Sequence, residues 1–344
     1  MGELPESQME AVERLFSTRI AGDISVEIVT REQCDAFARR LLDADVVRPV
    51  NYQGTMSYTT FSPSVKKEVQ FRLQPLDNGM LSLAFQAYGD TVPQVTSIQH
   101  FALPVYISAF NPGHLHIFQT FPEHQFPLER QKRTVQDVAR FIARGATLPL
   151  PRYSLKPGGW TLEAGTLLQR IIDASDLKKL EPRYAARAAT LLSQLHLLDK
   201  LPPVITNQVF AELNIMVEPD TGALTGVLDF DGARIEAFGM CIFGVYESFF
   251  GRMYMGEWRW FEQKALDGEK TVRQVLEAAF WHAFWENVPL QYPKEDYEDA
   301  VKLAVEIGMI NRYVTELLDG IDENNEQCRM NLEWSRGVWL GADL

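Results

Sequence analysis

Residues 204–251 read VITNQVFAELNIMVEPDTGALTGVLDFDGARIEAFGMCIFGVYESFFG. Asn214 opens the apolar run NIMV, Asp229 follows the apolar run GVL, and the segment EPDTGALT lies between them. Two short apolar runs joined by a segment rich in Pro, Asp and Gly predict a β-hairpin. The hairpin would bring the amide of Asn214 and the carboxylate of Asp229 to one end. Oxygen ligands of this kind suit Mg²⁺, which leaves room for phosphate oxygens, so we predict a metal site there.

The composition is that of a globular protein. Of the 344 residues, 46% are hydrophobic and 23% are charged, and the chain is long enough for two lobes with separate cores. The formal net charge of -13 argues against nucleic acid or an anionic membrane as the main partner, because both favour basic patches. An acidic N-terminal segment and no run of about 18 apolar residues predict a cytoplasmic protein without a membrane segment.

Cysteine and histidine spacing gives little support to a second metal site. Cys34, Cys241 and Cys328 are far apart, which predicts inert thiols and no disulfide framework. His114 and His116 stand two residues apart, and on a strand both rings would share one face, as a metal site needs. No carboxylate or cysteine cluster accompanies them, so we interpret them as ordinary strand histidines.

The periodicity of apolar residues changes along the chain. Residues 30–44 have an N-cap candidate in Thr30 and apolar residues on one helical face, which predicts a helix. Residues 47–74 alternate aromatic or β-branched residues with polar ones, as antiparallel strands do. VTSIQHFALPVYISAF and HLHIFQTF predict further strands, and from about residue 127 onward segments with helical periodicity dominate.

We therefore predict an α+β, bilobal protein in three parts: a helical lead-in (1–47), a β-rich N-lobe (48–120) and a mainly helical C-lobe (121–344) that carries the hairpin. The junction between two lobes is a common place for ligand sites, so we expect a small-molecule cleft there. Trp334 and Trp339 predict that the C-terminal tail docks on the helical lobe. The oligomeric state is open.

The hairpin segment also resembles a known family. Residues 205–233, ITNQVFAELNIMVEPDTGALTGVLDFDGA, resemble the catalytic region of the aminoglycoside phosphotransferase and choline kinase family, which typically shows HGDxxxxN, a strand, a turn and a strand ending V-I-D-F or V-I-D-W. Residues 236–251 resemble the branch of this family common in fungi. More weakly, QGTMSYTT resembles its phosphate-loop hairpin and EVQFR its third strand. The resemblance covers most of residues 48–290.

The resemblance implies a protein-kinase-like fold that binds Mg²⁺ with ATP or another nucleotide and transfers the terminal phosphoryl group to a small-molecule hydroxyl. It further implies that Asn214 and Asp229 hold the metal. Asp231 would be a third oxygen ligand if the chain stays extended, because strand side chains alternate with a period of two.

The nucleotide-binding half of the resemblance is atypical. Arg72 stands where kinases have a strand Lys, and Arg is a competent phosphate ligand with a fixed fork of donors. Gly54 is the single glycine of the QGTMSYTT hairpin, so hydroxyls such as that of Ser57 would replace a glycine-rich cradle. The alternative for Arg72 is a solvated side chain or one paired with Asp77.

The catalytic motif departs from the family at the base. The family's HGD falls on Asn207, Gln208 and Val209, and valine cannot accept a proton. The loss of a general base costs on the order of 10²–10⁴-fold in rate. Glu212 is the nearest carboxylate and a candidate replacement, although an exposed loop residue is the simpler interpretation.

Three hypotheses follow. The first is a kinase-fold protein with a small-molecule cleft that is not an efficient phosphotransferase and has been repurposed, for example in fungal specialised metabolism. The second is a slow phosphotransferase that still uses Mg²⁺ and ATP, and the third is a non-catalytic adaptor. The aromatic residues between Phe249 and Trp285 are mostly helix core, but some would give a ligand pocket an apolar or aromatic preference.

Overall fold

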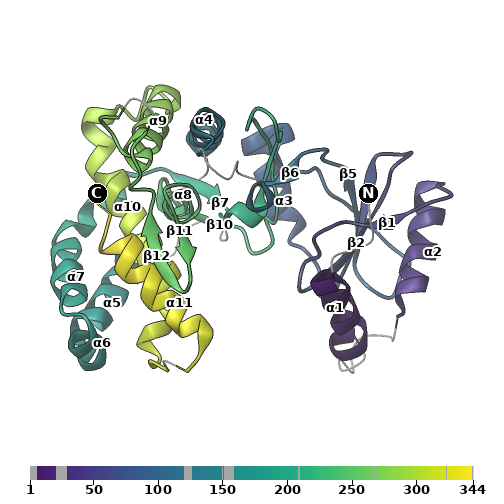
Figure 1. The fold of residues 1–344 in the computed structure, drawn as a ribbon, viewed down its shortest axis with the longest axis horizontal. Helices are drawn as coiled ribbons and strands as arrows, with labels where there is room; N and C mark the ends of the chain where they lie inside the picture. The colour runs from purple at the N-terminus through teal and green to yellow at the C-terminus, as the bar shows by residue number, and fades with distance from the viewer. Residues whose placement is uncertain are drawn as a thin grey trace. The chain divides into compact units, whose positions relative to one another are not determined.

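The computed structural model describes residues 6–20, 29–119, 126–148, 150, 159–207, 210–265, 268–322, 324–342 and 344. These residues form helices and antiparallel sheets, so the predicted α+β class is confirmed. Their contacts divide the chain into two compact units, residues 1–85 with 92–112 and residues 86–91 with 113–344 (Figure 1). None of the described helices combines the length and the apolar character that a membrane span requires.

The first unit is built on a five-stranded sheet with strand order β1-β2-β3-β5-β4. Its strands are β1 (Arg48–Pro49), β2 (Ser57–Ser62), β3 (Lys67–Arg72), β4 (Thr96–Ile98) and β5 (Val105–Ala109). The helical segments α1 (Glu6–Arg14), η1 (Leu15–Ile20) and α2 (Arg31–Leu42) precede the sheet. The predicted start of α2 is confirmed, because Thr30 and Gln33 form a reciprocal capping box.

One face of this sheet is apolar, and the other mixes polar residues with buried aromatic residues such as Phe61 and Tyr106. Residues directly opposite one another share a face, so the pairing of Tyr58 with Phe71 and of Phe71 with Val105 defines the apolar face. These side chains form one buried cluster with residues of α1, η1 and α2, such as Val12, Leu15 and Cys34. The opposite face carries polar residues at Ser57, Glu68, Gln70, Arg72 and Ser108.

The second unit contains most of the helices and three small sheets. Helix α3 (Asn78–Tyr88) belongs to the first unit up to Phe85, and its end and η2 (Gly89–Thr91) belong to the second. The strands of the second unit are β6 (His114–Leu115), β7 (Pro203–Thr206), β8 (Ile215–Val217), β9 (Leu224–Val227), β10 (Arg234–Ala237), β11 (Gly251–Tyr254) and β12 (Glu257–Trp260). They pair as β6-β8-β9, β7-β10 and β11-β12.

The helices of this unit confirm the predicted dominance of helical segments after residue 127. They are α4 (Leu128–Gly145), α5 (Gly159–Asp173), α6 (Ser175–Leu180), α7 (Arg183–Gln194), α8 (Phe243–Phe249), α9 (Val272–Asn287), α10 (Lys294–Tyr313) and α11 (Glu326–Trp334). Shorter turns are η3 (His116–Phe118), η5 (Leu195–Lys200), η6 (Glu212–Asn214), η7 (Met240–Ile242), η8 (Glu316–Leu318) and η9 (Ser335–Trp339).

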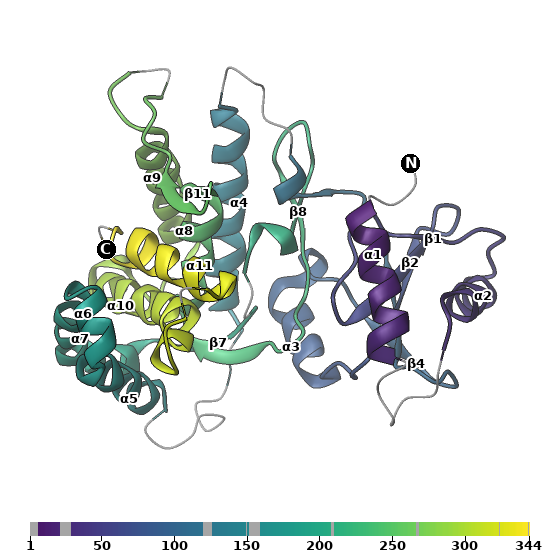
Figure 2. The same cartoon turned by 60° about the horizontal axis from the view of Figure 1, so that its bottom comes forward.

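Trp334 and Trp339 are buried, so the C-terminal tail docks on this unit as predicted. The indole Nε1 of Trp339 donates to Glu306 of α10 at 3.2 Å, and its ring stacks on Tyr184 of α7. Figure 2 shows α11 lying against α10. The last described segment is therefore part of the packed body.

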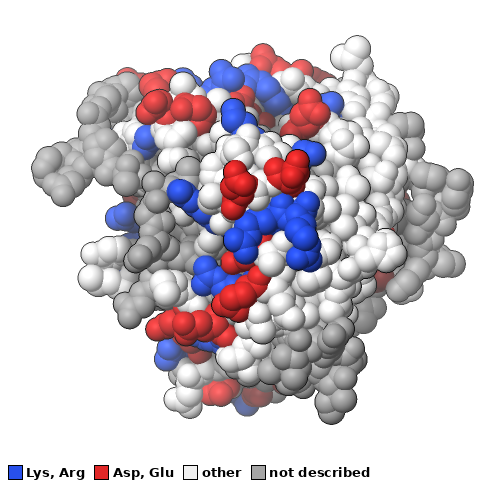
Figure 3. Space-filling model, turned by 90° about the vertical axis from the view of Figure 1, so that its right-hand side faces the viewer, with Lys and Arg blue, Asp and Glu red and all other residues white. Residues whose placement is uncertain are grey.

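The charges on the face drawn in Figure 3 are mixed, with Lys and Arg side chains flanked by Asp and Glu side chains. In the first unit, α2 has both signs, as in the ion pair between Arg31 and Asp35 at 3.9 Å. Neighbouring charges of opposite sign cancel much of each other's long-range field, so the described residues of this face create no broad potential of one sign.

Candidate functional site

The predicted hairpin is present in the second unit. Strands β8 and β9 pair antiparallel, with Ile215 opposite Val227. The backbone N–H of Leu228 donates to the carbonyl oxygen of Asn214 at 2.7 Å. Asn214 therefore lies opposite Leu228, which is the residue before Asp229. The backbones of the two predicted metal ligands thus meet at one end of the hairpin.

Asp229 has an unusual backbone conformation. Its φ is 59°, in the left-handed region that few residues other than glycine adopt, and its side chain is exposed. Asp tolerates this region better than most residues because its short polar side chain makes local hydrogen bonds. A non-glycine residue held there is a candidate for a functional constraint.

The chain does not stay extended beyond β9. The strand ends at Val227, Asp229 has positive φ, and Asp231 and Gly232 lie in a turn. The condition under which Asp231 was predicted to lie on the same side as Asp229, an extended chain, is therefore not met. The role of Asp231 as a third ligand stays a prediction.

The residues present fit a Mg²⁺ ion bound together with phosphate. One amide and one or two carboxylates are a sufficient protein contribution, since Mg²⁺ is usually completed by waters and phosphate oxygens. Within the described ranges, no group of three or more His, Cys, Asp or Glu side chains is arranged to hold a metal by itself. Cys34 and Cys241 are buried, and burial raises the pKa of each thiol to about 12, so both stay protonated.

Asn207, at the first position of the atypical HGD motif, anchors the hairpin. Its side chain is 3% exposed, and its amide Nδ2 donates to the carbonyl oxygen of Leu228 at 2.6 Å. This bond ties the end of β7 to the residue that precedes Asp229. Gln208 and Val209, the other two positions of the motif, lie outside the described residues.

Glu212 lies in η6 beside a buried histidine. Its backbone N–H donates to Ser248 Oγ at 3.1 Å, and its Oε2 lies 3.5 Å from Nδ1 of His116. The imidazole is 4% exposed, and its Nε2 lies 2.9 Å from Gln131 Oε1. The Glu212 side chain keeps 39% exposure, so its carboxylate is partly solvated and has a defined neighbour.

The strand predicted through HLHIFQTF ends after Leu115. His114 is exposed in β6, whereas His116 begins η3 and turns inward toward Gln131. The two rings therefore do not share a strand face, and the interpretation as strand histidines holds for His114 alone. A buried polar partner on α4 overrides the alternating pattern here.

Glu247 of α8 is a second carboxylate near Glu212. It accepts a hydrogen bond from the Tyr313 hydroxyl at 2.8 Å, and Arg312 lies 3.9 Å away. Burial raises the pKa of Glu247, Arg312 and Tyr313 oppose the rise, and the negative charge of Glu212 adds to it. Glu212 and Glu247 thus share one electrostatic environment.

The structure brings together the three residues predicted to bind nucleotide in the first unit. Ser57 is the cross-strand partner of Arg72. Gln70 links them, because its Nε2 donates to Ser57 Oγ at 3.3 Å and its Oε1 accepts from Arg72 Nη1 at 3.4 Å. A Cβ atom on Gly54 would lie 2.8 Å from Ser57 Oγ, so a larger residue at position 54 would displace the Ser57 hydroxyl.

Arg72 is 6% exposed, so the alternative of a solvated arginine is wrong. Asp77, the other partner considered for it, caps α3 by accepting from the N–H groups of Gly79 and Met80 at 2.9 and 3.1 Å. A buried guanidinium on the more polar face of the sheet retains the fork of donors that phosphate recognition uses. Its role in nucleotide binding stays a prediction.

The aromatic residues between Phe249 and Trp285 divide between helix core and a β-hairpin. Tyr254, Trp258 and Trp260 lie on β11 and β12 and are exposed or partly buried, so the prediction of mostly helix core was wrong for this segment. Phe250, Phe280 and Phe284 are fully buried, and Phe280 stacks on Phe284 with ring centroids 6.0 Å apart. Arg273 covers the ring of Trp260 at 3.7 Å, in a close cation–π contact. A contribution of these rings to a ligand pocket stays a prediction.

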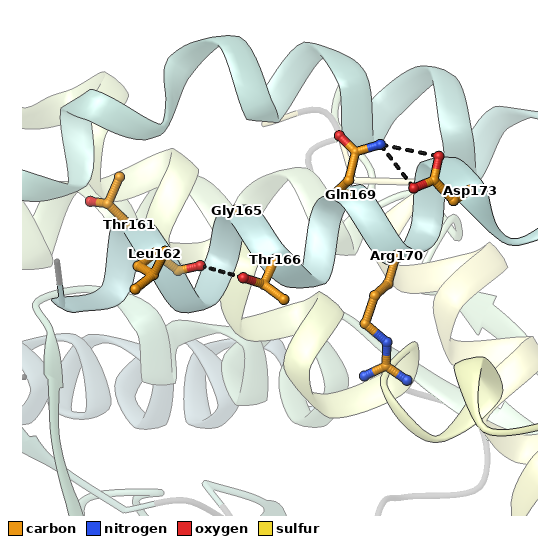
Figure 4. Close-up of a pocket in the computed structure, with 7 residues that line it drawn as sticks. All are labelled: Thr161, Leu162, Gly165, Thr166, Gln169, Arg170 and Asp173. Atoms are coloured by element: carbon orange, nitrogen blue, oxygen red, sulfur yellow. Dashed lines mark hydrogen bonds between the residues drawn. The ribbon is translucent and has the colours of Figure 1, made fainter.

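An open depression in the second unit is lined by a single helix, α5 (Figure 4). The polar side chains along it include Gln169, which donates to Asp173 at 3.1 Å, and Arg170, which pairs with Asp319 at 2.9 Å. None of the predicted site residues lines it. It is therefore not the candidate site.

No protein-family model matches the sequence, and no curated protein is similar to it. Solved structures match over nearly the full chain. An ethanolamine kinase from Plasmodium vivax has a TM-score of 0.53 at 11% identity, covering 99% of this chain and 97% of that one. The chain has the fold of small-molecule phosphotransferases.

Two further structures agree. An apoenzyme of macrolide 2'-phosphotransferase from Brachybacterium faecium has a TM-score of 0.52 at 13% identity, covering 88% of this chain and 98% of that one. The GDP complex of aminoglycoside 2'-phosphotransferase-IIIa has a TM-score of 0.50 at 12% identity, with coverages of 98% and 99%. The predicted resemblance and kinase-like fold are therefore confirmed, and at these identities the likeness concerns the fold alone.

Proposed function

We propose that the chain is a kinase-fold protein that binds a Mg²⁺–nucleotide complex and is an inefficient phosphotransferase toward a small-molecule hydroxyl. The observation that carries the proposal is the pairing of Asn214 with Leu228, which brings the Asn214 and Asp229 backbones to one end of the β8–β9 hairpin. When bound, Mg²⁺ would supply charge neutralisation for the phosphates. Asn214 and Asp229 would hold it there.

The first unit supports nucleotide binding through a second group of residues. Arg72, Gly54 and Ser57 are close together, and Arg72 contributes a planar, always charged fork of donors. Among the proteins of similar fold, one was solved as its GDP complex. Either ATP or another nucleotide is compatible with these residues, because phosphate recognition does not select the base.

The proposed inefficiency rests on Val209. Positioning and electrostatic stabilisation of the phosphoryl group need no base, and they account for most of the catalysis in this class of reaction. Proton removal from the acceptor does need one, and an isopropyl group cannot provide it. Glu212 is the replacement candidate, because its partly exposed carboxylate stands two residues before Asn214.

The acceptor is proposed to be an apolar or aromatic small molecule, because half-buried rings such as Trp281 and Trp285 accompany the core of α9. Residues 236–251 resemble fungal members of the aminoglycoside phosphotransferase and choline kinase family. We therefore propose a role in fungal specialised metabolism. The further alternative is a non-catalytic adaptor.

The test is nucleotide binding measured by thermal unfolding and calorimetry. Mg²⁺ with ATP or GTP is expected to raise the melting temperature, since a ligand at a hundred times its Kd stabilises by about 2.7 kcal/mol. Asp229→Asn is expected to abolish the shift. Asp220→Asn, in the turn of the same hairpin, is the matched control and should retain it. No shift with either nucleotide in a folded wild-type protein would overturn the proposal.

A further inference from the structure

Residues 50–57, which are the loop between β1 and β2 together with Ser57, the first residue of β2, carry both Gly54 and Ser57. Its conformation is set by Gln53, whose side chain is 4% exposed. The amide Nε2 of Gln53 donates to the carbonyl oxygens of Val50 and Thr59 at 3.0 and 2.9 Å, and its Oε1 accepts from the Thr59 N–H at 2.9 Å. One buried side chain thus closes the loop onto β2.

The same residue is held from outside by the N-terminal helix. The backbone N–H of Gln53 donates to Oε1 of Gln8 at 2.7 Å. Gln8 lies in the first turn of α1, 45 residues away in sequence. The N–H that it binds immediately precedes Gly54, so this contact acts on the segment that approaches Ser57 most closely.

The position of α1 is fixed by apolar packing. Val12 and Leu15 are each 3% exposed, within the cluster that covers the apolar sheet face. Phe16 packs edge-on against Tyr58, the neighbour of Ser57, with ring centroids 5.4 Å apart. Figures 1 and 2 both show α1 beside β2. A helix anchored in this way holds Gln8 at a defined distance from the loop.

We propose that Gln8 is a positioning residue, through which α1 holds the 50–57 loop in the conformation that presents Gly54 and Ser57 to nucleotide phosphates. The identity of the ligand, a nucleotide, rests on the proposed function. The positioning of the loop rests on the hydrogen bond between Gln8 and Gln53. Covering the sheet needs only the apolar face of α1. The polar contact to the loop couples the helix to the candidate phosphate site, so loss of the contact loosens the loop and weakens phosphate binding.

The test compares Gln8→Met with Gln8→Glu in the full chain. Met has nearly the volume and helix propensity of Gln but only a weakly accepting thioether sulfur for the Gln53 N–H, whereas Glu keeps an acceptor oxygen at the same reach. Met9→Ala is the control, because Met9 is 42% exposed on the same helix. Two quantities are measured: amide hydrogen exchange of peptides that cover residues 50–57, and the Kd for Mg²⁺ with ATP and with GTP.

Gln8→Met is expected to speed exchange and to raise the nucleotide Kd, each by roughly three- to tenfold, whereas Gln8→Glu and Met9→Ala stay near wild type. If amide exchange of residues 50–57 is unchanged in Gln8→Met, Gln8 does not position the loop. If exchange is faster in Gln8→Met but the nucleotide Kd is unchanged, the contact positions the loop without affecting nucleotide binding. If the wild-type protein binds neither nucleotide, the proposed function and the part of this inference that concerns the ligand are both overturned. Faster exchange in Gln8→Met would then still support the positioning of the loop by Gln8.

Discussion

At the scale of single residues, the contrast between Asn207 and Val209 is informative. Both replace members of the HGD motif, but Asn207 has a structural task, since it binds the carbonyl oxygen of Leu228 beside Asp229. The first position of the motif therefore still helps to hold the proposed metal-binding end of the hairpin. The side chain at the third position is apolar and has no proton-accepting group.

Restoring a carboxylate at residue 209 should therefore restore catalysis. Val209→Asp is expected to raise kcat for phosphoryl transfer by on the order of 10- to 100-fold, because a positioned general base contributes about 10²–10⁴-fold and this one would be only partly positioned. The rate is measured as nucleotide turnover with and without a panel of hydroxyl-bearing acceptors. The nucleotide Kd should stay the same.

Val209→Asn is the matched control for this substitution, because it has the size and polarity of Asp without its basicity. Equal rates for the two variants would show that proton acceptance at residue 209 is irrelevant. If both variants have the wild-type rate, the base is either supplied elsewhere, with Glu212 as the first candidate, or is not needed.

The sequence predicted the residues that lie next to one another in the hairpin and missed those that meet through tertiary contacts. Asn214 and Asp229 follow from two apolar runs and a turn, which is local information. His116 was assigned to a strand, and its contact with Glu212 depends on packing between η3 and η6. Gln53 carried no signal, because its hydrogen bonds require the loop to be folded first.

At the scale of elements, β3 shows how one strand serves two purposes. Its residues Val69 and Phe71 build the apolar core, while Glu68, Gln70 and Arg72 occupy the opposite face. Alternation predicted this division, since the period of a strand is two. It did not predict which polar residues become buried, because that depends on the loops and helices that cover the face.

Glu68 makes the stability of the first unit pH-dependent. Burial raises the pKa of its carboxyl to about 7, and a hydrogen bond from the Ser108 side chain opposes the rise. A carboxyl with a raised folded-state pKa stabilises the fold below its ordinary pKa of 4.5 and loses that contribution as the pH rises through about 7. The free energy of unfolding should therefore fall between these pH values.

Glu68→Gln is expected to remove this dependence. At pH 8 the variant should be more stable than the wild type by up to about 3 kcal/mol, because one pKa unit corresponds to about 1.36 kcal/mol. At pH 4 the two proteins should be nearly equal. Urea unfolding at both pH values measures the difference, with Glu13→Gln, at an exposed carboxylate of α1, as the control. A stability gain that is the same at both pH values would contradict the role of ionisation.

At the scale of the whole molecule, both terminal regions are tied into the unit that each belongs to. In the first unit α1 packs on the sheet, and in the second unit the C-terminal segment closes over α7 and α10. Sequence periodicity predicted the helical N-terminal region, and the two tryptophans predicted the docking of the C-terminal tail. It did not identify Glu306, the polar residue around which that docking is organised, because a single carboxylate in an apolar helix has no distinctive pattern.

Glu306 is buried and receives three donors. Arg187 binds it in a bidentate pair at 2.7 and 2.6 Å, and Trp339 Nε1 donates to it at 3.2 Å. Burial raises the pKa of Glu306, and the arginine opposes that rise. Arg187→Met is therefore expected to leave a poorly compensated buried charge and to lower the free energy of unfolding by roughly 2–4 kcal/mol, somewhat below the loss for a fully buried pair.

The loss in Arg187→Met should depend on pH in a defined direction. Without Arg187 the folded-state pKa of Glu306 rises further, so the variant loses more stability at pH 8, where the carboxylate is charged, than at pH 5, where it is partly protonated. Chemical unfolding at the two pH values, followed by the fluorescence of the seven tryptophans, measures both effects. Arg183→Met is the control, since Arg183 lies on the same helix and pairs with Glu181 at the surface, where ion pairs contribute little. Equal destabilisation by Arg183→Met and Arg187→Met would contradict this prediction. The docking of the C-terminal segment would then not depend on the buried pair, and apolar contacts of Trp334 and Trp339 would have to hold the segment instead.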